Sequence, residues 1–388
     1  MTNPDLEKVH LPEEALVEEE PLASSAAEEK ISVATQWQLM WWRFRKHRLA
    51  MAGSLVIIVF YLAVVGADFL AYADPELSEA NRALLSPQPI QLVDEGRFSP
   101  YVNGLTGERN MTTFKKVYKI DPSIKVPVVF FAKGYEYTLL GMKFDRHLIG
   151  VAEGNAADSI FLLGTDMIGR DVWSRLMLAT RISMTIGLVS VALSLFLGIL
   201  LGGISGYFGG TVDLVIQRLI ELLRSIPTIP LWMGLAAAMP RDWDIIKVYF
   251  TITIIISLVG WTGLARVVRG RFLSLREEDY VMAARFVGCS QLRIILRHMV
   301  PAFLSHIIAS VTLALPGMII SETALSFLGL GLRPPAISWG VLLQDAQNVQ
   351  TVALSPWLMI PAVPVIIAIL AFNFTGDGLR DAADPYGI

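Results

Sequence analysis

The stretch YVMAARFVGCSQLRIILRHMVP, Tyr280–Pro301, lies between two long apolar runs of the chain. Its spacing predicts a helix over 276–286, a reversal at Gly288, and a second helix over 291–299 with Ser290 as its N-cap. An apolar edge follows this helical pair, and it consists of Tyr280, Phe286, Val287, Leu292 and Ile295. An isolated loop would have little reason to expose such an edge, so we expect a partner helix or groove to bind it.

The whole chain is too apolar for a soluble globular protein. Its 388 residues are 54% hydrophobic and 17% charged, and the mean hydropathy is +0.53. The net charge of −3 creates no overall field that would attract nucleic acid. The single cysteine, Cys289, excludes an internal disulfide framework. We therefore expect a protein of the lipid bilayer that does not bind nucleic acid.

Six apolar runs each approach the length of about 20 residues that a helix needs to cross a hydrocarbon core of about 30 Å. The runs cover 49–70, 182–204, 214–239, 248–265, 302–320 and 357–374. They predict an all-α polytopic membrane protein with about six transmembrane helices.

The third run has to include charged residues to reach the length of a span. Arg218, Glu221 and Arg224 follow one another at three-residue spacing, and Pro227 and Pro230 would kink the same helix. Charges in a span usually pair with one another and face the protein interior or a water-filled pathway. Alternatively, the part of the helix that carries these three charged residues protrudes into the cytoplasm, and their charges are solvated. Both interpretations stay open.

Basic residues near the ends of the spans predict the orientation, because they resist translocation. The segment WWRFRKHR, Trp41–Arg48, precedes the first span, and seven arginines lie between the fourth and fifth spans. An even number of spans places both of these segments and both termini on one side, the cytoplasm. The expected location is the bacterial inner membrane, with a cytoplasmic loop over 270–300.

The remaining segments complete the expected organisation. Residues 1–35 are acidic and predict a disordered cytoplasmic tail, and 36–71 hold an N-terminal helix and the first span. Residues 72–165 include the strand-like run KVPVVFFAKGYEYTLLGMKF and predict a small β-rich extracytoplasmic insertion, which either elaborates the packing or docks a soluble partner. The transmembrane core would cover 166–376, and 377–388 would form a cytoplasmic C-terminus.

Three glycines in the second span are spaced four residues apart: Gly198, Gly202 and Gly206. This spacing leaves one helix face without side chains, so another helix backbone can approach it closely. The spacing predicts a helix-packing face, which either this chain or another subunit would occupy.

The opening stretch resembles the EAA loop of ABC importer permeases, in which a Glu-Ala-Ala triplet, three residues and a glycine precede a helix that ends near Leu-Pro. Here the triplet is Met282-Ala283-Ala284, so the glutamate is missing, and Arg285 begins the three residues before Gly288. The second helix ends at Val300-Pro301. The resemblance implies that this loop is the coupling helix on which the ATPase acts.

Other segments are similar to the dipeptide, oligopeptide and nickel branch of those permeases. They are WWRFRKHRLAMAGS (41–54), LLGTDMIGRDVWSRLMLATRIS (162–183), SETALSFLGLGLRPPAISWGVLLQDA (321–346) and FNFTGDGLRDAADPY (372–386). The resemblance covers roughly 37–386 and implies a type I ABC importer permease fold, similar to the oligopeptide and dipeptide permease C subunits. It further implies a heterodimer with a second homologous permease, two ABC ATPase subunits that carry ATP and Mg, and an extracytoplasmic solute-binding protein.

The sequence itself indicates a transport subunit rather than an enzyme. It contains no GxxxxGK[ST] loop and no Gly-Lys pair, so we expect no cofactor in this chain and ATP hydrolysis on partner chains. No nucleophile, base or metal-ligand set is evident; Asp166, Asp171 and Glu322 are better explained as polar interfacial and helix-end residues.

The resemblance implies that the solute is a dipeptide or oligopeptide. Related permeases also serve nickel, glutathione, opines and oligosaccharides, so these stay open. An ion-gradient-driven secondary transporter is the alternative from another class; it would require intramembrane acids or unwound helices in two repeated halves, and the sequence offers Glu221 but no convincing repeat.

Overall fold

The structure is a computed structural model that describes residues 35–109, 116–139, 141–151, 160–240 and 242–383. The predicted acidic tail, apart from Thr35, lies outside the described residues, and so do residues 384–388. Thr35 is the N-cap of the first described helix, α2 (Gln36–Lys46), and its hydroxyl accepts the Gln38 N–H while the Gln38 side chain accepts the Thr35 N–H. This reciprocal capping box explains where the helix begins.

Five helices within the described residues are long and apolar enough to cross a bilayer. They are α3 (Arg48–Val65), α5 (Val172–Phe208), α8 (Ile245–Leu275), α12 (Leu304–Phe327) and α15 (Ala362–Ala383). A bent helix pair supplies a sixth span if the two are counted together. The all-α membrane fold with about six spanning helices is therefore confirmed.

The third span is not the single kinked helix that we expected over 214–239. It consists of α6 (Gly210–Ser225) and α7 (Thr228–Ala237), which meet at 85°. Pro227 occupies the N-cap position of α7, and Pro230 lies in its first turn. A proline there removes an N–H that would have no helical partner anyway. The two prolines thus start a new helix instead of bending one.

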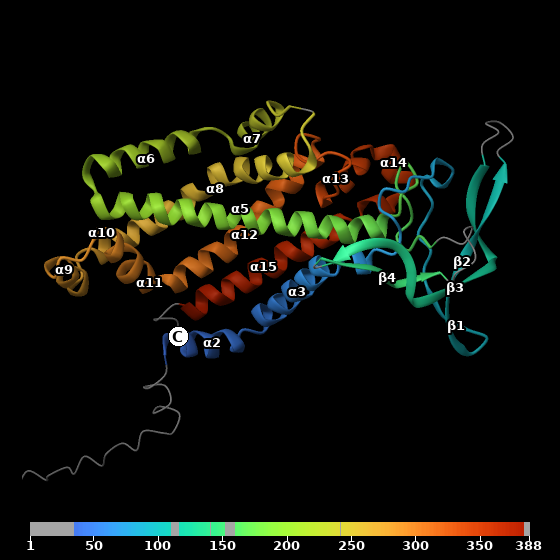
Figure 1. The fold of residues 1–388 in the computed structure, drawn as a ribbon, viewed down its shortest axis with the longest axis horizontal. Helices are drawn as coiled ribbons and strands as arrows, with labels where there is room; N and C mark the ends of the chain where they lie inside the picture. The colour runs from blue at the N-terminus through green and yellow to red at the C-terminus, as the bar shows by residue number, and fades with distance from the viewer. Residues whose placement is uncertain (1–34, 110–115, 140, 152–159, 241, 384–388) are drawn as a thin grey trace, which may run out of the picture.

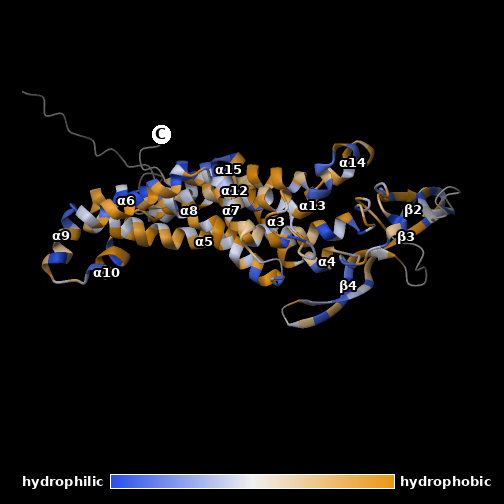
Figure 2. Cartoon of the chain, turned by 90° about the horizontal axis from the view of Figure 1, so that it is seen from above, coloured by the Kyte–Doolittle hydropathy of each residue, from blue (hydrophilic) through white to orange (hydrophobic). Residues whose placement is uncertain are grey.

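The long helices pack along one another, with α5 beside α8 and α15 between α3 and α12 (Figure 1). The main core lies among them and is built around the fully buried side chains of Met184, Ile252 and Trp339. Hydrophobic residues predominate along these helices, whereas α9 and the strands carry more hydrophilic ones (Figure 2). This distribution is the one expected of a bundle that lies in lipid.

Short elements connect the long helices at the two ends of the bundle. At one end, α8 is joined to α12 by α9 (Asp279–Phe286), α10 (Gln291–Arg293), a π-helix (Ile294–Met299) and α11 (Val300–Ala302). We call this stretch, residues 276–303, the α9–α11 segment. The short helices elsewhere are α4 (Ala67–Leu70), α13 (Trp339–Leu343), α14 (Val349–Leu354) and the 3₁₀ turns Ala80–Arg82, Gln344–Gln347 and Pro356–Met359.

The insertion between the first two spans contains an antiparallel four-stranded sheet in the order β1-β2-β3-β4. Its strands are β1 (Gln91–Asp94), β2 (Arg97–Arg109), β3 (Lys116–Leu139) and β4 (Met142–Val151). The long strand β3 pairs with β2 through its first part and with β4 through its second. We call residues 72–165 the β module; it lies at the opposite end of the bundle from α9 (Figure 1).

Candidate functional site

The helix α9 is shorter than the predicted helix over 276–286. The preceding helix α8 continues to Leu275, and a turn follows it, so α9 begins only at Asp279. The carboxylate of Asp279 in the first turn complements the positive end of the helix dipole. The predicted helix is therefore three residues too long at its start, and its end at Phe286 is as expected.

One face of α9 is buried and fixes its position. Val281 and Ala284 pack into a cluster with Phe272 of α8 and with Ile294 and Met299 of the returning segment. These side chains are between 0% and 8% exposed. Ile307 of α12 belongs to the same cluster, which therefore joins α9 to both α8 and α12.

The opposite face of the α9–α11 segment presents apolar side chains to the outside. Phe286 is 90% exposed and Val287 83% exposed, and Tyr280 and Leu292 are also exposed. Ile295, which we expected on the same edge, is buried in the cluster instead. Ile295 lies in a π-helix, Ile294–Met299, whose buried residues also include Ile294 and Met299.

The reversal at Gly288 is a Schellman motif. The Cys289 N–H bonds to the Ala284 carbonyl and the Gly288 N–H to the Arg285 carbonyl, both at 3.0 Å. Gly288 has a φ of +80°, a left-handed conformation that glycine adopts without strain. Ser290 occupies the N-cap position of α10 as predicted, but its side chain makes no capping hydrogen bond.

The remaining residues of the expected coupling set point in different directions. Met282 and Ala283 are exposed and Ala284 is buried, so the two alanines do not form one smooth patch. The Arg285 guanidinium lies 4.9 Å from the centre of the Tyr207 ring, near the end of α5. Pro301 lies within α11.

The charges of the third span lie on the surface of α6. Arg218 pairs with Glu221 at 2.6 Å, and their side chains are 72% and 52% exposed. Arg224 is exposed as well. Sequence reasoning missed the stronger pair on this helix, in which Asp213 binds Arg269 of α8 through two hydrogen bonds of 2.5 Å.

The three spaced glycines of α5 face α8 of the same chain. A Cβ added at Gly202 would lie 2.5 Å from the Ala265 carbonyl oxygen, and one at Gly206 would lie 2.8 Å from the Arg269 carbonyl oxygen. A Cβ at Gly198 would meet the Leu264 side chain at 2.9 Å. Because these contacts are with backbone or packed side chains, no larger residue fits without separating the helices.

Glu322 is neither interfacial nor at a helix end, contrary to expectation. It lies inside α12, fully buried, and accepts hydrogen bonds from Ser183 Oγ of α5 at 2.9 Å and Ser326 Oγ at 2.8 Å. Ser183 in turn accepts the Trp339 N–H at 3.1 Å. The carboxylate thus joins α5, α12 and the start of α13.

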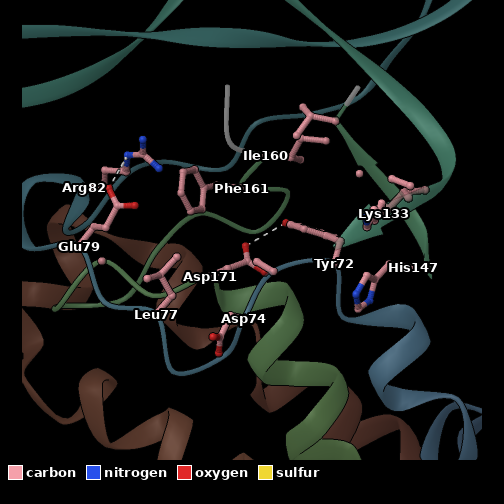
Figure 3. A pocket seen from close by; sticks show the side chains of 16 residues that line it. Tyr72, Asp74, Leu77, Glu79, Arg82, Lys133, His147, Ile160, Phe161 and Asp171 are labelled. Carbon is pink, nitrogen blue, oxygen red and sulfur yellow. Dashed lines mark hydrogen bonds and ion pairs between the residues drawn. The ribbon is translucent and has the colours of Figure 1, made fainter. Parts of the chain in front are cut away.

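The β module is attached to the bundle around a cavity of about 210 Å³ (Figure 3). Tyr72 donates a hydrogen bond of 2.9 Å to Asp171, whose second oxygen accepts the Ser174 N–H and caps α5. Burial raises the pKa of Asp171 to about 6. Asp166 pairs with Arg170 at 2.6 Å, in the loop before α5. Asp166 therefore stabilises the loop before α5, and Asp171 caps the start of that helix. Glu322 lies apart from both, because it contacts Ser183 about three turns further along α5.

Comparisons with known proteins identify relatives of this chain. Residues 198–386 match the family model for the inner membrane component of binding-protein-dependent transport systems, and residues 35–87 match the N-terminal transmembrane domain of oligopeptide transport permease C. A chain of the MetNI methionine ABC transporter, in an inward-facing conformation, is 16% identical, with a TM-score of 0.40, over 54% of this chain and 96% of that chain.

Curated relatives are transport permeases of similar extent. The oligopeptide transport system permease protein OppC of Haemophilus influenzae is 40% identical over 68% of this chain and 79% of its own length. The dipeptide transport system permease protein DppC of Lactococcus lactis is 31% identical over 90% of both chains. The resemblance inferred from the sequence motifs is confirmed, and with it the type I permease fold class. The chain belongs to the family of binding-protein-dependent inner-membrane permeases that includes the oligopeptide and dipeptide permease C proteins.

Proposed function

We propose that this chain is one permease subunit of an ATP-driven importer of peptide-like solutes. The exposed apolar face of the α9–α11 segment carries the proposal, because a rigid helix that presents Phe286 and Val287 is suited to a groove in a partner. A second homologous permease would complete the pathway, and two ABC ATPase subunits with ATP and Mg would bind α9. An extracytoplasmic binding protein would deliver the solute.

In this proposal the α9 end of the bundle, both termini and residues 270–300 face the cytoplasm. The distribution of basic residues supports this orientation: seven arginines lie between 266 and 297, whereas the short segments at the other end hold few. The β module would then lie outside the inner membrane.

Closure of the two ATPases would push α9, and the buried cluster would pass the movement to α8 and α12. Gly288 fixes the angle between α9 and the returning helix. The pathway would open alternately to the two sides without any chemistry on the solute, so the chain would not act as an enzyme.

The relatives' names favour peptides as the solute. Nickel, glutathione, opines and oligosaccharides are the alternatives within the family, and identifying what co-purifies with the binding protein distinguishes them. A secondary transporter is less well supported, because Glu221 lies on the surface of α6 and pairs with Arg218 of its own helix.

Cysteine crosslinking tests the proposal directly. With the native Cys289 replaced by serine in every variant, Val287→Cys in the assembled importer should crosslink to an ATPase subunit, and the yield should change when ATP is added. Val349→Cys is the matched control, because Val349 is equally exposed at 82% but lies on α14 at the other end of the bundle. Crosslinking of Val349→Cys instead of Val287→Cys to the ATPase would overturn the proposal.

A further inference from the structure

An apolar groove of about 620 Å³ lies between α5 and the returning part of the α9–α11 segment. One wall comes from α5 and the other from the stretch between α10 and α11. The side chains that define the two walls are Leu200, Ile204 and Phe208, and Leu292, Leu296 and Val300. Gln291 is the one polar residue among those that line the described groove. Such a surface is costly to leave in contact with water, by about 25 cal/mol for each Å².

The position of the groove along α5 places it in lipid. Leu200 and Ile204 lie within the apolar part of a spanning helix, and Phe208 is its last residue. The inference rests on the proposed orientation, in which this end of α5 is cytoplasmic. The groove then begins in the hydrocarbon of the inner leaflet and ends at the headgroup level.

Arginines accompany the wall that lies nearer the cytoplasm. Arg293 directly follows Leu292 and Arg297 directly follows Leu296, and both arginines are exposed. Within the described residues neither forms an ion pair. Arg285 lies over Tyr207, the neighbour of Phe208, so a third cation is close to the same end of the groove. A hydrophobic slot with cations at its cytoplasmic mouth matches a lipid with an apolar chain and an anionic headgroup.

We propose that this groove binds an anionic phospholipid of the inner leaflet, with an acyl chain between the walls and the headgroup phosphate at Arg293 and Arg297. The wall formed by Leu296 belongs to a π-helix, a distortion that is frequent at functional sites. The lipid would contact both α5 and the segment that carries α9. It would therefore support the geometry of the coupling segment from its membrane side.

Native mass spectrometry of the assembled importer, purified from membranes that contain phosphatidylglycerol, tests the site. The unaltered importer should retain phosphatidylglycerol in preference to phosphatidylcholine. Leu200→Trp should fill the groove and reduce the retained lipid at least fivefold. Leu188→Trp is the control, because Leu188 is similarly exposed on α5, at 46% against 41%, but does not line the groove. Equal retention by the two tryptophan variants would overturn the proposal.

A charge variant tests the headgroup. Arg293→Gln with Arg297→Gln should abolish the preference for phosphatidylglycerol, whereas Arg266→Gln, at an exposed arginine of α8, should keep it. A photocrosslinking residue at Leu296 should yield an adduct with the mass of one phospholipid. An adduct with a polypeptide would assign the groove to a protein partner and overturn the lipid site. If the importer takes up solute with ATP but retains no lipid, only this inference is refuted. If it retains the lipid but shows no ATP-driven uptake, only the proposed transport function is refuted.

Discussion

Arg269 of α8 and Asp213 of α6 form a bidentate ion pair, in which Arg269 Nε and Nη2 each donate a hydrogen bond of 2.5 Å to one carboxylate oxygen. Ser205 of α5 donates to the same carboxylate, and Gln217 donates to Ser205 at 3.1 Å. Three helices are therefore joined by polar contacts near the α9 end of the bundle. The first turn of α6 is held in place there, although α6 and α7 are bent sharply further along.

Loss of this pair should destabilise the bundle. Asp213→Asn keeps the shape but removes the charge, and we expect it to lower the free energy of unfolding by about 1–3 kcal/mol, because the pair is charge-assisted and partly buried. Thermal unfolding in detergent measures the change. Glu221→Gln, which breaks the exposed pair with Arg218, should cost less than about 1 kcal/mol. Equal losses in the two variants would contradict the interpretation.

The contact between α5 and α8 should not tolerate a methyl group at Gly202. Gly202→Ala would place Cβ 2.5 Å from a backbone oxygen, so we expect a loss of about 1–3 kcal/mol from overpacking. Gly263→Ala on α8 is the control, because no atom lies within 4 Å of the added Cβ and alanine favours helix. The melting temperature in detergent should fall for the first variant only.

Substitution of Gly288 should uncouple ATP hydrolysis from uptake without removing the protein from the membrane. Gly288→Val meets no steric obstacle but has to adopt a φ of +80°, which costs a residue with a Cβ about 1–2 kcal/mol. Gly288→Asn should retain more uptake, since asparagine tolerates this conformation. ATPase activity and peptide uptake in proteoliposomes provide the measurement. Unchanged uptake by Gly288→Val would contradict the prediction.

The attachment of the β module should depend on pH through Asp171. Burial raises the pKa of this carboxyl from 3.8 to about 6, so the folded state holds the proton more tightly than the unfolded state. The stabilising contribution of Asp171 is complete below pH 3.8 and is lost as the pH rises through 6. Above that pH the stability no longer changes through this group. Asp171→Asn should remove this change in melting temperature between pH 4 and 7.

Asp121 provides the control for the pH measurement. Hydrogen bonds from Ser123 and Thr106 lower its pKa to about 2. The stability therefore depends on pH in the opposite direction. The stabilising contribution of Asp121 is present above pH 3.8 and is lost only as the pH falls through 2. Asp121→Asn should leave the profile between pH 4 and 7 unaltered. A profile that is the same in unaltered protein and Asp171→Asn would contradict the assignment to Asp171.

Replacement of β1–β4 by a short linker should impair delivery by the binding protein. The sheet exposes large apolar side chains, among them Phe98 and Phe131, which suit a docking surface. Uptake at limiting solute should fall, while the protein remains folded in the membrane. Wild-type uptake at limiting solute would show that the module only elaborates the packing.

The spanning helices could be predicted because a long apolar run has few other stable environments. The turn at Gly288 could be predicted as well, since glycine followed by a capping residue is a local signal. The break at Pro227 could not, because the same proline can bend a helix or begin one, and tertiary packing decides between them. The partners Asp213 and Arg269 lie 56 residues apart, and no local pattern connects them. The buried position of Glu322 could not be predicted for the same reason, because one of its two serine partners, Ser183, belongs to α5.

The 37 residues of α5 form one unbroken helix, and at 1.5 Å per residue it is a rod about 55 Å long. Asp171 anchors one tip beneath the β module, and Tyr207 touches Arg285 of α9 at the other. Tilting such a rod by about 5° about one tip displaces the far tip by about 5 Å, roughly one helical turn. In the proposed importer, a binding protein docked at one tip and an ATPase bound at the other would therefore be linked mechanically by a single stiff helix.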